Sequence, residues 1–269
     1  NGGADTDLYN VLTGLQDLGY TIHLFVVHEV SSSDRGRINP EHLPFPATRL
    51  DFSRAELTHE NLGTTIKAAV DTWRPNLVFV QHGYALKPYV LEALKAHKTV
   101  ARYYAHELAC ARDALRFKDG HPCPQDYLRS PEQCRKCAIE HQREAIESSH
   151  LLTWNVDYLA AKAYTASYYS IMMASLKNTN AIIVSNSDMK AHLNGFHENV
   201  FILPGGVHVE AVPHHEPIKK DETKIKTILM AGRVDDPLKG LQVLMEAGHR
   251  LACTRKDFAI WATHFDHTL

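Results

Sequence analysis

Apolar and polar positions along the chain alternate between stretches with helical spacing and short, continuous apolar runs. Leu8, Leu12 and Leu15 recur at helical spacing and predict a helix over residues 5–17, followed by a strand over residues 20–27. The same reasoning predicts helices over residues 54–73, 89–96 and 239–252, and strands over 76–81, 98–104, 180–184, 199–203, 226–230 and 257–261. Because each predicted strand is a continuous apolar run, we expect parallel sheets covered on both faces. The predicted fold class is α/β with Rossmann-like topology.

A change in composition divides the chain into two predicted domains. Pro204-Gly205-Gly206 and the polar residues 213–222 are typical of a linker. We therefore expect an N-terminal domain over residues 1–205 and a C-terminal domain over 206–269. No strand precedes the first helix, and the second domain holds about two strands and one helix, so both domains are expected to be truncated.

Composition and charge exclude some classes of partner. The 269 residues are 44% hydrophobic with a formal net charge of -2, which gives no electrostatic footprint for nucleic acid. Residues 151–176 form the longest weakly charged stretch, but Asn155, Asp157 and Lys162 interrupt it. We expect a helix packed in the core there, not a membrane span. With no signal peptide at the start, a cytoplasmic protein is expected.

One short motif after a predicted strand carries two cations. Gly232 and Arg233 follow the apolar run 226–230, and Lys239 comes six residues after the arginine. A glycine that permits close approach of the backbone, a planar guanidinium and a flexible ammonium suit phosphate oxygens. Two solvated surface cations are the simpler alternative.

Motifs in a fixed order resemble those of the family-4 retaining glycosyltransferases. They are Asn1-Gly2-Gly3, Asp17-Leu-Gly-Tyr20, the stretch 73–82, Ile182-Ile-Val-Ser-Asn-Ser187, Leu203-Pro-Gly-Gly-Val207, and Ala231-Gly-Arg233 with Lys239-Gly240. The resemblance implies a GT-B fold of two Rossmann-like domains. It also implies transfer of a sugar from a UDP-, GDP- or ADP-linked donor to a sugar, lipid-linked or small-molecule acceptor, with retention of anomeric configuration. A lipid-linked acceptor would place the enzyme at the membrane surface.

The resemblance also assigns roles to individual residues. Arg233 and Lys239 would be catalytic, holding the donor diphosphate and stabilising the charge that builds on it as the glycosidic bond breaks. Gly232 and the loop glycines Gly2 and Gly3 would approach the same diphosphate. No cofactor is required for this chemistry.

Two histidines are assigned to the acceptor side by the same resemblance. His106 and, less securely, His82 follow predicted strands, and ligands bind outside the carboxyl ends of such strands. His106 is expected near the sugar without acting as a general base, because the donor phosphate is thought to take the acceptor proton in this family. The family's paired glutamates, seven residues apart, do not follow the second-domain motif. We therefore expect a fragment that lacks part of the donor site and has little or no activity.

An insertion over about residues 107–140 departs from the simplest family pattern. It contains Cys110, Cys123, Cys134 and Cys137, and the last two form a Cys-x-x-Cys. Four such residues could hold a structural zinc ion, although the spacings are not those of a common zinc finger. Free thiols and disulfides are the alternatives, and Cys253 is expected to be a packed core residue.

Other functions fit the same architecture. A nucleotide-sugar epimerase would need acid and base carboxylates that the sequence does not reveal. A transferase-like domain that only binds a partner is a second alternative. A NAD-dependent enzyme is disfavoured because no Gly-x-Gly-x-x-Gly motif is present.

Overall fold

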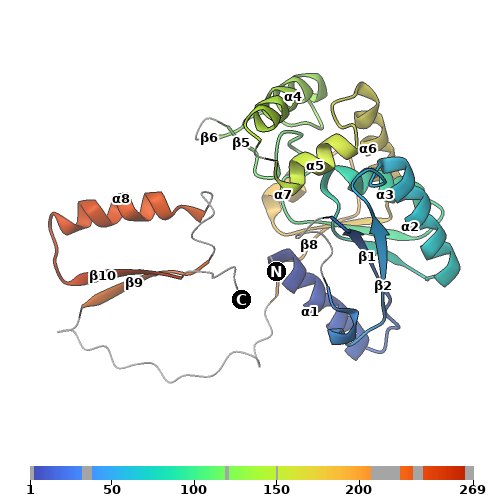
Figure 1. Ribbon diagram of the computed structural model, residues 1–269, viewed down its shortest axis with the longest axis horizontal. Helices are drawn as coiled ribbons and strands as arrows, with labels where there is room; N and C mark the ends of the chain where they lie inside the picture. Colours follow the sequence, from blue (N-terminus) through green and yellow to red (C-terminus); the bar gives the residue numbers. More distant parts are fainter. Residues whose placement is uncertain are drawn as a thin grey trace. The chain divides into compact units, whose positions relative to one another are not determined.

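The computed structural model describes residues 3–31, 38–118, 121–149, 151–206, 225–232 and 239–263 (Figure 1). Contacts between residues divide the chain into two units, Asn1–Val209 and Glu210–Leu269. Each unit combines helices with parallel strands, so the predicted α/β class with parallel sheets is confirmed. Within the described ranges, no helix has both the length and the apolar character needed to cross a bilayer.

A four-stranded parallel sheet forms the centre of the first unit. Its strands, in spatial order, are β3 (Val78–Val80), β4 (Thr99–Tyr103), β7 (Ala181–Val184) and β8 (Val200–Ile202). A separate parallel pair consists of β1 (Leu24–Glu29) and β2 (Ala47–Phe52). Because all four strands of the central sheet run in the same direction, their carboxyl ends meet at one edge. We call this the carboxyl edge of the first unit.

Seven helices and two short 3₁₀ turns are described in the first unit. They are α1 (Gly3–Asp17), α2 (His59–Trp73), α3 (Lys87–Ala93), α4 (Pro131–Glu147), α5 (Thr153–Ala160), α6 (Ala166–Asn178), α7 (Ser187–His192), η1 (Pro40–His42) and η2 (Tyr84–Leu86). Helix α3 contacts α2 and α6, and the three lie side by side in Figure 1. Their apolar side chains, among them Leu62, Leu91 and Leu176, are buried in the core. The burial of apolar surface therefore fixes these helices against the sheet.

Local chemistry explains where α2 begins and ends. The hydroxyl of Thr58 accepts a hydrogen bond from the N–H of Asn61, so the helix begins at His59 and not at residue 54 as predicted. Arg74 adopts a left-handed conformation with φ 53°, and Pro75 follows it. Because proline cannot continue a helix and restricts the residue before it, α2 ends at Trp73.

The cysteine-bearing insertion holds more regular structure than the sequence predicted. Strands β5 (Phe117–Lys118) and β6 (His121–Pro122) form a small antiparallel hairpin. Helix α4 follows and buries only Ala138 and Gln142. The Gln142 amide donates to the carbonyl of Arg112 at 3.4 Å, and the Asn155 amide donates to Gln142 at 2.8 Å.

Several predicted boundaries differ from the structure. The strand expected from residue 20 begins at Leu24. The single helix expected over residues 151–176 is wrong, because α5 and α6 are separated at residues 161–165, where Lys162 has a left-handed φ of 49°. Strand β2 and helices α4 and α7 were not predicted.

The second unit contains a βαβ element. Strands β9 (Lys226–Met230) and β10 (Phe258–Ala262) pair in parallel, and helix α8 (Leu241–Ala252) connects them. A Cβ atom at Gly248 would lie 2.4 Å from Cδ1 of Ile260, so a glycine at this position allows close packing of helix on strand.

Candidate functional site

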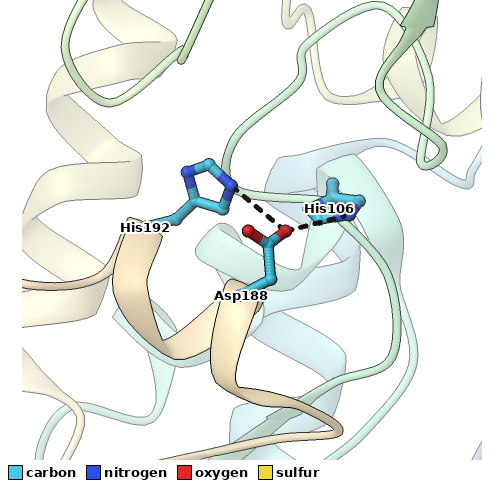
Figure 2. A group of neighbouring side chains, drawn as sticks. All are labelled: His106, Asp188 and His192. Atoms are coloured by element: carbon cyan, nitrogen blue, oxygen red, sulfur yellow. Dashed lines mark ion pairs between the residues drawn. The ribbon is translucent and has the colours of Figure 1, made fainter. Parts of the chain in front are cut away.

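Polar side chains from two neighbouring strand ends meet at the carboxyl edge of the first unit. His106 lies in the turn after β4, and Asp188 and His192 lie one helical turn apart on α7, which follows β7. Figure 2 shows the three side chains pointing toward one another. Oδ2 of Asp188 is 3.8 Å from Nε2 of His106 and 3.6 Å from Nε2 of His192. The parallel pairing of β4 with β7 therefore assembles the group.

Helix α7 is fixed in place by its own N-cap. The side chain of Asn186 accepts a hydrogen bond from the N–H of Met189 at 2.9 Å. Met189 and Leu193 are buried in the core, and His192 lies beside them with a side chain that is 15% exposed, whereas Asp188 points to the open side of the helix. Asp188 is 69% exposed, which makes its carboxylate the group of the three most accessible to a ligand.

His192 is held by two residues of the cysteine-bearing insertion. Its Nδ1 lies 2.8 Å from a carboxylate oxygen of Asp126, and its Nε2 lies 2.6 Å from Nη1 of Arg116. Because a guanidinium can only donate, Nε2 accepts and Nδ1 carries the proton that it donates to Asp126. Asp126 is itself buried and bonded to the N–H of Leu128 and to Arg129. The imidazole of His192 is thereby fixed in one tautomer and one orientation.

His106 has a different environment. Burial lowers the pKa of its imidazole, Asp188 opposes this effect, and the charge of Arg116 adds to it. Its Nδ1 is buried and has no hydrogen-bond partner among the described residues. A cavity of about 10 Å³ lies beside it, lined by Tyr103 and Leu193 among others, with room for about one water molecule. A larger ligand would therefore meet His106 from the open side where Asp188 is exposed.

The ends of β3 and of α1 reach the same edge. His82 follows β3, with Nε2 3.3 Å from Oδ1 of Asp5 on α1, and its ring stacks on Tyr104 with centroids 6.1 Å apart. The Gln81 amide donates to the carbonyl of Ala4 at 2.8 Å. The first turn of α1 therefore lies beside His82, one of the two histidines that were assigned to the acceptor side. Gly3 begins this helix and has no atom within 4 Å of an added Cβ, whereas Gly2 lies outside the described residues.

A buried ion pair anchors α1 at this edge. Nη2 of Arg102 is 3.0 Å from Oδ2 of Asp7 and donates to the carbonyl of Leu203 at 3.1 Å. The Tyr104 hydroxyl also donates to Asp7 at 2.5 Å. The side chains of Arg102 and Asp7 are nearly fully buried. This network ties α1 to the ends of β4 and β8, and it leaves the open side of the edge to other groups.

Two of the predicted donor-side residues, Gly232 and Lys239, lie in the second unit, between the end of β9 and the start of α8. Gly232 has φ 140°, and its N–H donates to the hydroxyl of Thr263 at 2.9 Å, just past β10. Lys239 is exposed and immediately precedes Gly240, the N-cap of α8, which has a left-handed φ of 80°. Arg233 lies outside the described residues. A left-handed glycine and an exposed lysine thus stand at the start of α8.

The five cysteines, all within the described ranges, are free thiols. Among the described residues, the one group of three His, Cys, Asp or Glu ligand atoms that all lie within 4.8 Å of one another is His106, Asp188 and His192. Cys253, predicted to be packed in the core, is exposed at the end of α8, so that prediction is wrong.

Sequence reasoning identified His106 but not the residues that surround it. Asp188 and His192 follow the Ser-Asn-Ser motif at a helical spacing of four, which could have indicated a shared face. Arg116 and Asp126 are far from α7 in the sequence, and no local pattern connects them to it.

Among known proteins, matches to this chain come from solved structures. Two α/β units with parallel sheets define the class of fold. Neither the family models nor the curated proteins gave a match to the chain. A solved structure from Listeria monocytogenes, assigned as a UDP-N-acetylglucosamine 2-epimerase, is similar with a TM-score of 0.38 and 11% sequence identity. The similarity covers 93% of this chain and 64% of that structure, so this chain spans less than two thirds of its length.

Proposed function

We propose that this protein is a retaining glycosyltransferase that moves a sugar from a nucleotide sugar to an acceptor. One observation carries the proposal: His82, which lies against the first turn of α1, and His106 follow the neighbouring parallel strands β3 and β4 at the carboxyl edge. Open α/β sheets bind ligands in this position, and the motifs that resemble the family-4 transferases assign the same residues to the acceptor. The fold alone would not choose a reaction.

The proposed chemistry divides between the two units. The bond from the anomeric carbon to the donor phosphate oxygen breaks, and negative charge builds on the diphosphate. Lys239, together with Arg233, stabilises that charge, and Gly232 allows close approach of the backbone. The acceptor hydroxyl forms the new bond on the same face of the sugar, and its proton passes to the departing phosphate oxygen. His106 and His82 orient the acceptor by hydrogen bonds.

The state of His106 supports this role. Since burial lowers its pKa, the imidazole is neutral at pH 7 and offers one donor and one acceptor to sugar hydroxyls. The exposed carboxylate of Asp188 can accept a hydrogen bond from a second sugar hydroxyl.

A nucleotide-sugar epimerase is the second candidate, favoured by Asp188. Epimerisation moves a proton off and onto a sugar carbon, so it needs paired acid and base groups. The sequence alone revealed no such carboxylate, whereas Asp188 lies within 3.8 Å of two imidazoles.

The test incubates the protein with UDP-, GDP- and ADP-sugars and follows the products by NMR. A transferase releases nucleoside diphosphate only with an acceptor and gives a product with the donor's anomeric configuration. An epimerase changes the sugar without any acceptor. If neither a nucleoside diphosphate nor an epimerised sugar forms, and no nucleotide sugar raises the melting temperature, both candidates are refuted.

Variants sharpen the assignment. Lys239→Ala should reduce the rise in melting temperature that a nucleotide sugar causes, because one cation that pairs with the diphosphate is lost, and this readout does not need turnover. Lys256→Ala is the matched control, because Lys256 is an exposed lysine at the other end of α8 whose Nζ bonds to the carbonyl of Ala252. Equal shifts of the melting temperature in the two variants would contradict the role of Lys239.

A further inference from the structure

Two aromatic side chains meet beside the carboxyl edge of the first unit. Tyr84 begins η2, two residues after His82, and Trp154 lies in the first turn of α5. Their rings make an edge-to-face contact with centroids 5.2 Å apart. Tyr84 is 36% exposed, and Trp154 is half-buried. We call these two residues the aromatic pair.

Trp154 is bonded to the segment that holds His106. Its Nε1 donates to the carbonyl of Arg112 at 2.9 Å. The N–H of His106 donates to the carbonyl of Ala114 at 2.9 Å, two residues further along the same segment. Tyr84 belongs to the turn after β3, which is the neighbour of β4 in the sheet. The aromatic pair therefore joins the turn after β3 to the segment that follows β4.

The backbone holds Tyr84 in a conformation that a bulky residue rarely adopts. Its φ is 40°, in the left-handed region, and Gly83 before it has a φ of 124°. The turn brings Leu86 and Lys87 into the core, where they are 1% and 0% exposed, and the N–H of each donates to the carbonyl of Gly83. Glycine or asparagine would adopt the φ of Tyr84 with less strain. A bulky side chain kept in a strained conformation is typical of functional sites.

The groups around the aromatic pair match the two kinds of surface on a pyranose. Hydroxyl groups line the rim of such a sugar, and its C–H groups form apolar faces that pack on aromatic rings. His82 and Asp5, with Nε2 and Oδ1 3.3 Å apart, are 47% and 57% exposed, so both can bond to hydroxyls at the end of β3. The exposed ring of Tyr84 supplies the apolar surface. Ligand sites commonly combine aromatic walls with a few polar groups in this way.

We propose that the aromatic pair is a stacking platform for a pyranose ring of the acceptor. The acceptor is therefore a saccharide, or carries one beside its reactive hydroxyl. Tyr84 contacts the apolar face of the sugar, and Trp154 contacts the Tyr84 ring and limits its rotation. An acyl chain would use the ring without the hydrogen-bonding groups beside it, whereas a pyranose uses both. This inference rests on the proposed function, because it names the acceptor class of the same site.

The first experiment measures sugar binding without any donor. Saturation-transfer NMR is recorded with the methyl pyranosides of glucose, galactose, mannose and N-acetylglucosamine, with irradiation of the aromatic protons of the protein. At least one glycoside should receive saturation on the C–H groups of one ring face. Glycerol, which has hydroxyl groups but no ring face, should receive none. A lack of saturation in all four glycosides would overturn the proposal.

Variants with a matched control assign the binding to one ring. Tyr84→Ala should weaken glycoside binding roughly 3- to 10-fold, as expected for the loss of one aromatic contact, whereas Tyr84→Phe keeps the ring and should bind like the wild type. Tyr20→Ala is the control, because Tyr20 is an exposed tyrosine of the first unit that precedes β1, at the amino end of that strand. Equal binding by Tyr84→Ala and Tyr20→Ala would contradict the platform.

A further variant separates binding from folding. Glycine adopts a φ of 40° without strain, so Tyr84→Gly should have a urea midpoint at least as high as that of Tyr84→Ala. Its glycoside binding should be as weak as that of Tyr84→Ala, because both variants lack the ring. Binding by Tyr84→Gly as tight as in the wild type would overturn the proposal.

Turnover distinguishes failure of this inference from failure of the proposed function. With a saccharide acceptor, Tyr84→Ala should raise KM for the acceptor and leave kcat nearly unchanged, because stacking is equally strong in the ground state and the transition state. Transfer with an unchanged KM in Tyr84→Ala would refute the platform and leave the transferase in place. Glycoside binding that depends on Tyr84, without transfer from any nucleotide sugar, would refute the proposed function alone.

Discussion

Lys87 and Glu107 form a buried ion pair directly behind the candidate site. Nζ of Lys87 is 2.8 Å from Oε2 of Glu107, and the two side chains are 0% and 6% exposed. Nζ also donates to the carbonyl of Arg102 at 2.9 Å and lies 4.1 Å from the ring centroid of Tyr103. Burial lowers the pKa of Lys87, and Glu107 opposes that effect. The charged form of Lys87 is therefore stabilised by Glu107. Glu107 is next to His106 in the sequence, so the ion pair lies close to the candidate site.

Replacement of Lys87 by Met keeps most of the side-chain volume but leaves the carboxylate of Glu107 buried without a counter-charge. Loss of one partner of a buried pair costs about 3–5 kcal/mol in the free energy of unfolding. The double variant Lys87→Met with Glu107→Leu removes both charges, and such replacements are often neutral or stabilising. We therefore expect the double variant to be more stable than Lys87→Met.

Urea unfolding followed by tryptophan fluorescence measures these differences. The background variant Trp261→Phe removes the tryptophan of the second unit and leaves Trp73 and Trp154, so the signal reports on the first unit. A loss below about 1 kcal/mol for Lys87→Met, a value typical of an exposed pair, would refute the reasoning. A double variant as unstable as the sum of the two single variants would also refute it.

Three further predictions follow from the structure. Burial lowers the pKa of His106 below the ordinary 6.5, so on acidification the unfolded chain takes up this proton before the folded protein does. The free energy of unfolding should therefore fall as the pH drops below about 6.5. The wild type should lose more of it between pH 7.5 and 5.5 than His106→Gln does, and equal losses would contradict this. Asn186→Ala removes the N-cap of α7 and should lower the free energy of unfolding by about 1 kcal/mol. It should also lower activity, because Asp188 and His192 lie on that helix. An unchanged melting temperature would show that the cap contributes nothing. Gly63→Ala should raise the free energy of unfolding by about 0.5–1 kcal/mol, because a glycine inside a helix is destabilising. The added Cβ would lie 3.4 Å from Cβ of Ala93, which is an ordinary contact distance. A lower urea midpoint would indicate overpacking.

The sequence predicted the parts of the fold whose signals are local. Strands β4, β7 and β9 are apolar runs, and their positions agree with prediction within one residue at most ends. The break between α5 and α6 escaped prediction because Lys162 and its neighbours have no proline or glycine to mark it. In such a case the left-handed turn is imposed by packing of the flanking helices.

The candidate site was only partly predictable for a different reason. His106 was assigned through the motifs that resemble the family-4 transferases, and its position after a strand is a local property that agrees with that assignment. Asp188 reaches it only because β4 pairs with β7, and no pattern in a single sequence states which strands are neighbours. Arg116 and Asp126 depend on how the insertion folds back over α7, so their contacts with His192 could not be anticipated.

The network around Arg102 has a consequence for how the protein is made. Its guanidinium bonds to Asp7, 95 residues earlier, and to the carbonyl of Leu203, 101 residues later. Contacts of such long sequence separation form late, because the loops between them must close first. On the ribosome, Arg102 must therefore await about a hundred further residues before its last partner emerges, at roughly 5–20 residues per second. Until then the carboxyl edge of the first unit stays incomplete, and during that interval it is exposed to chaperones.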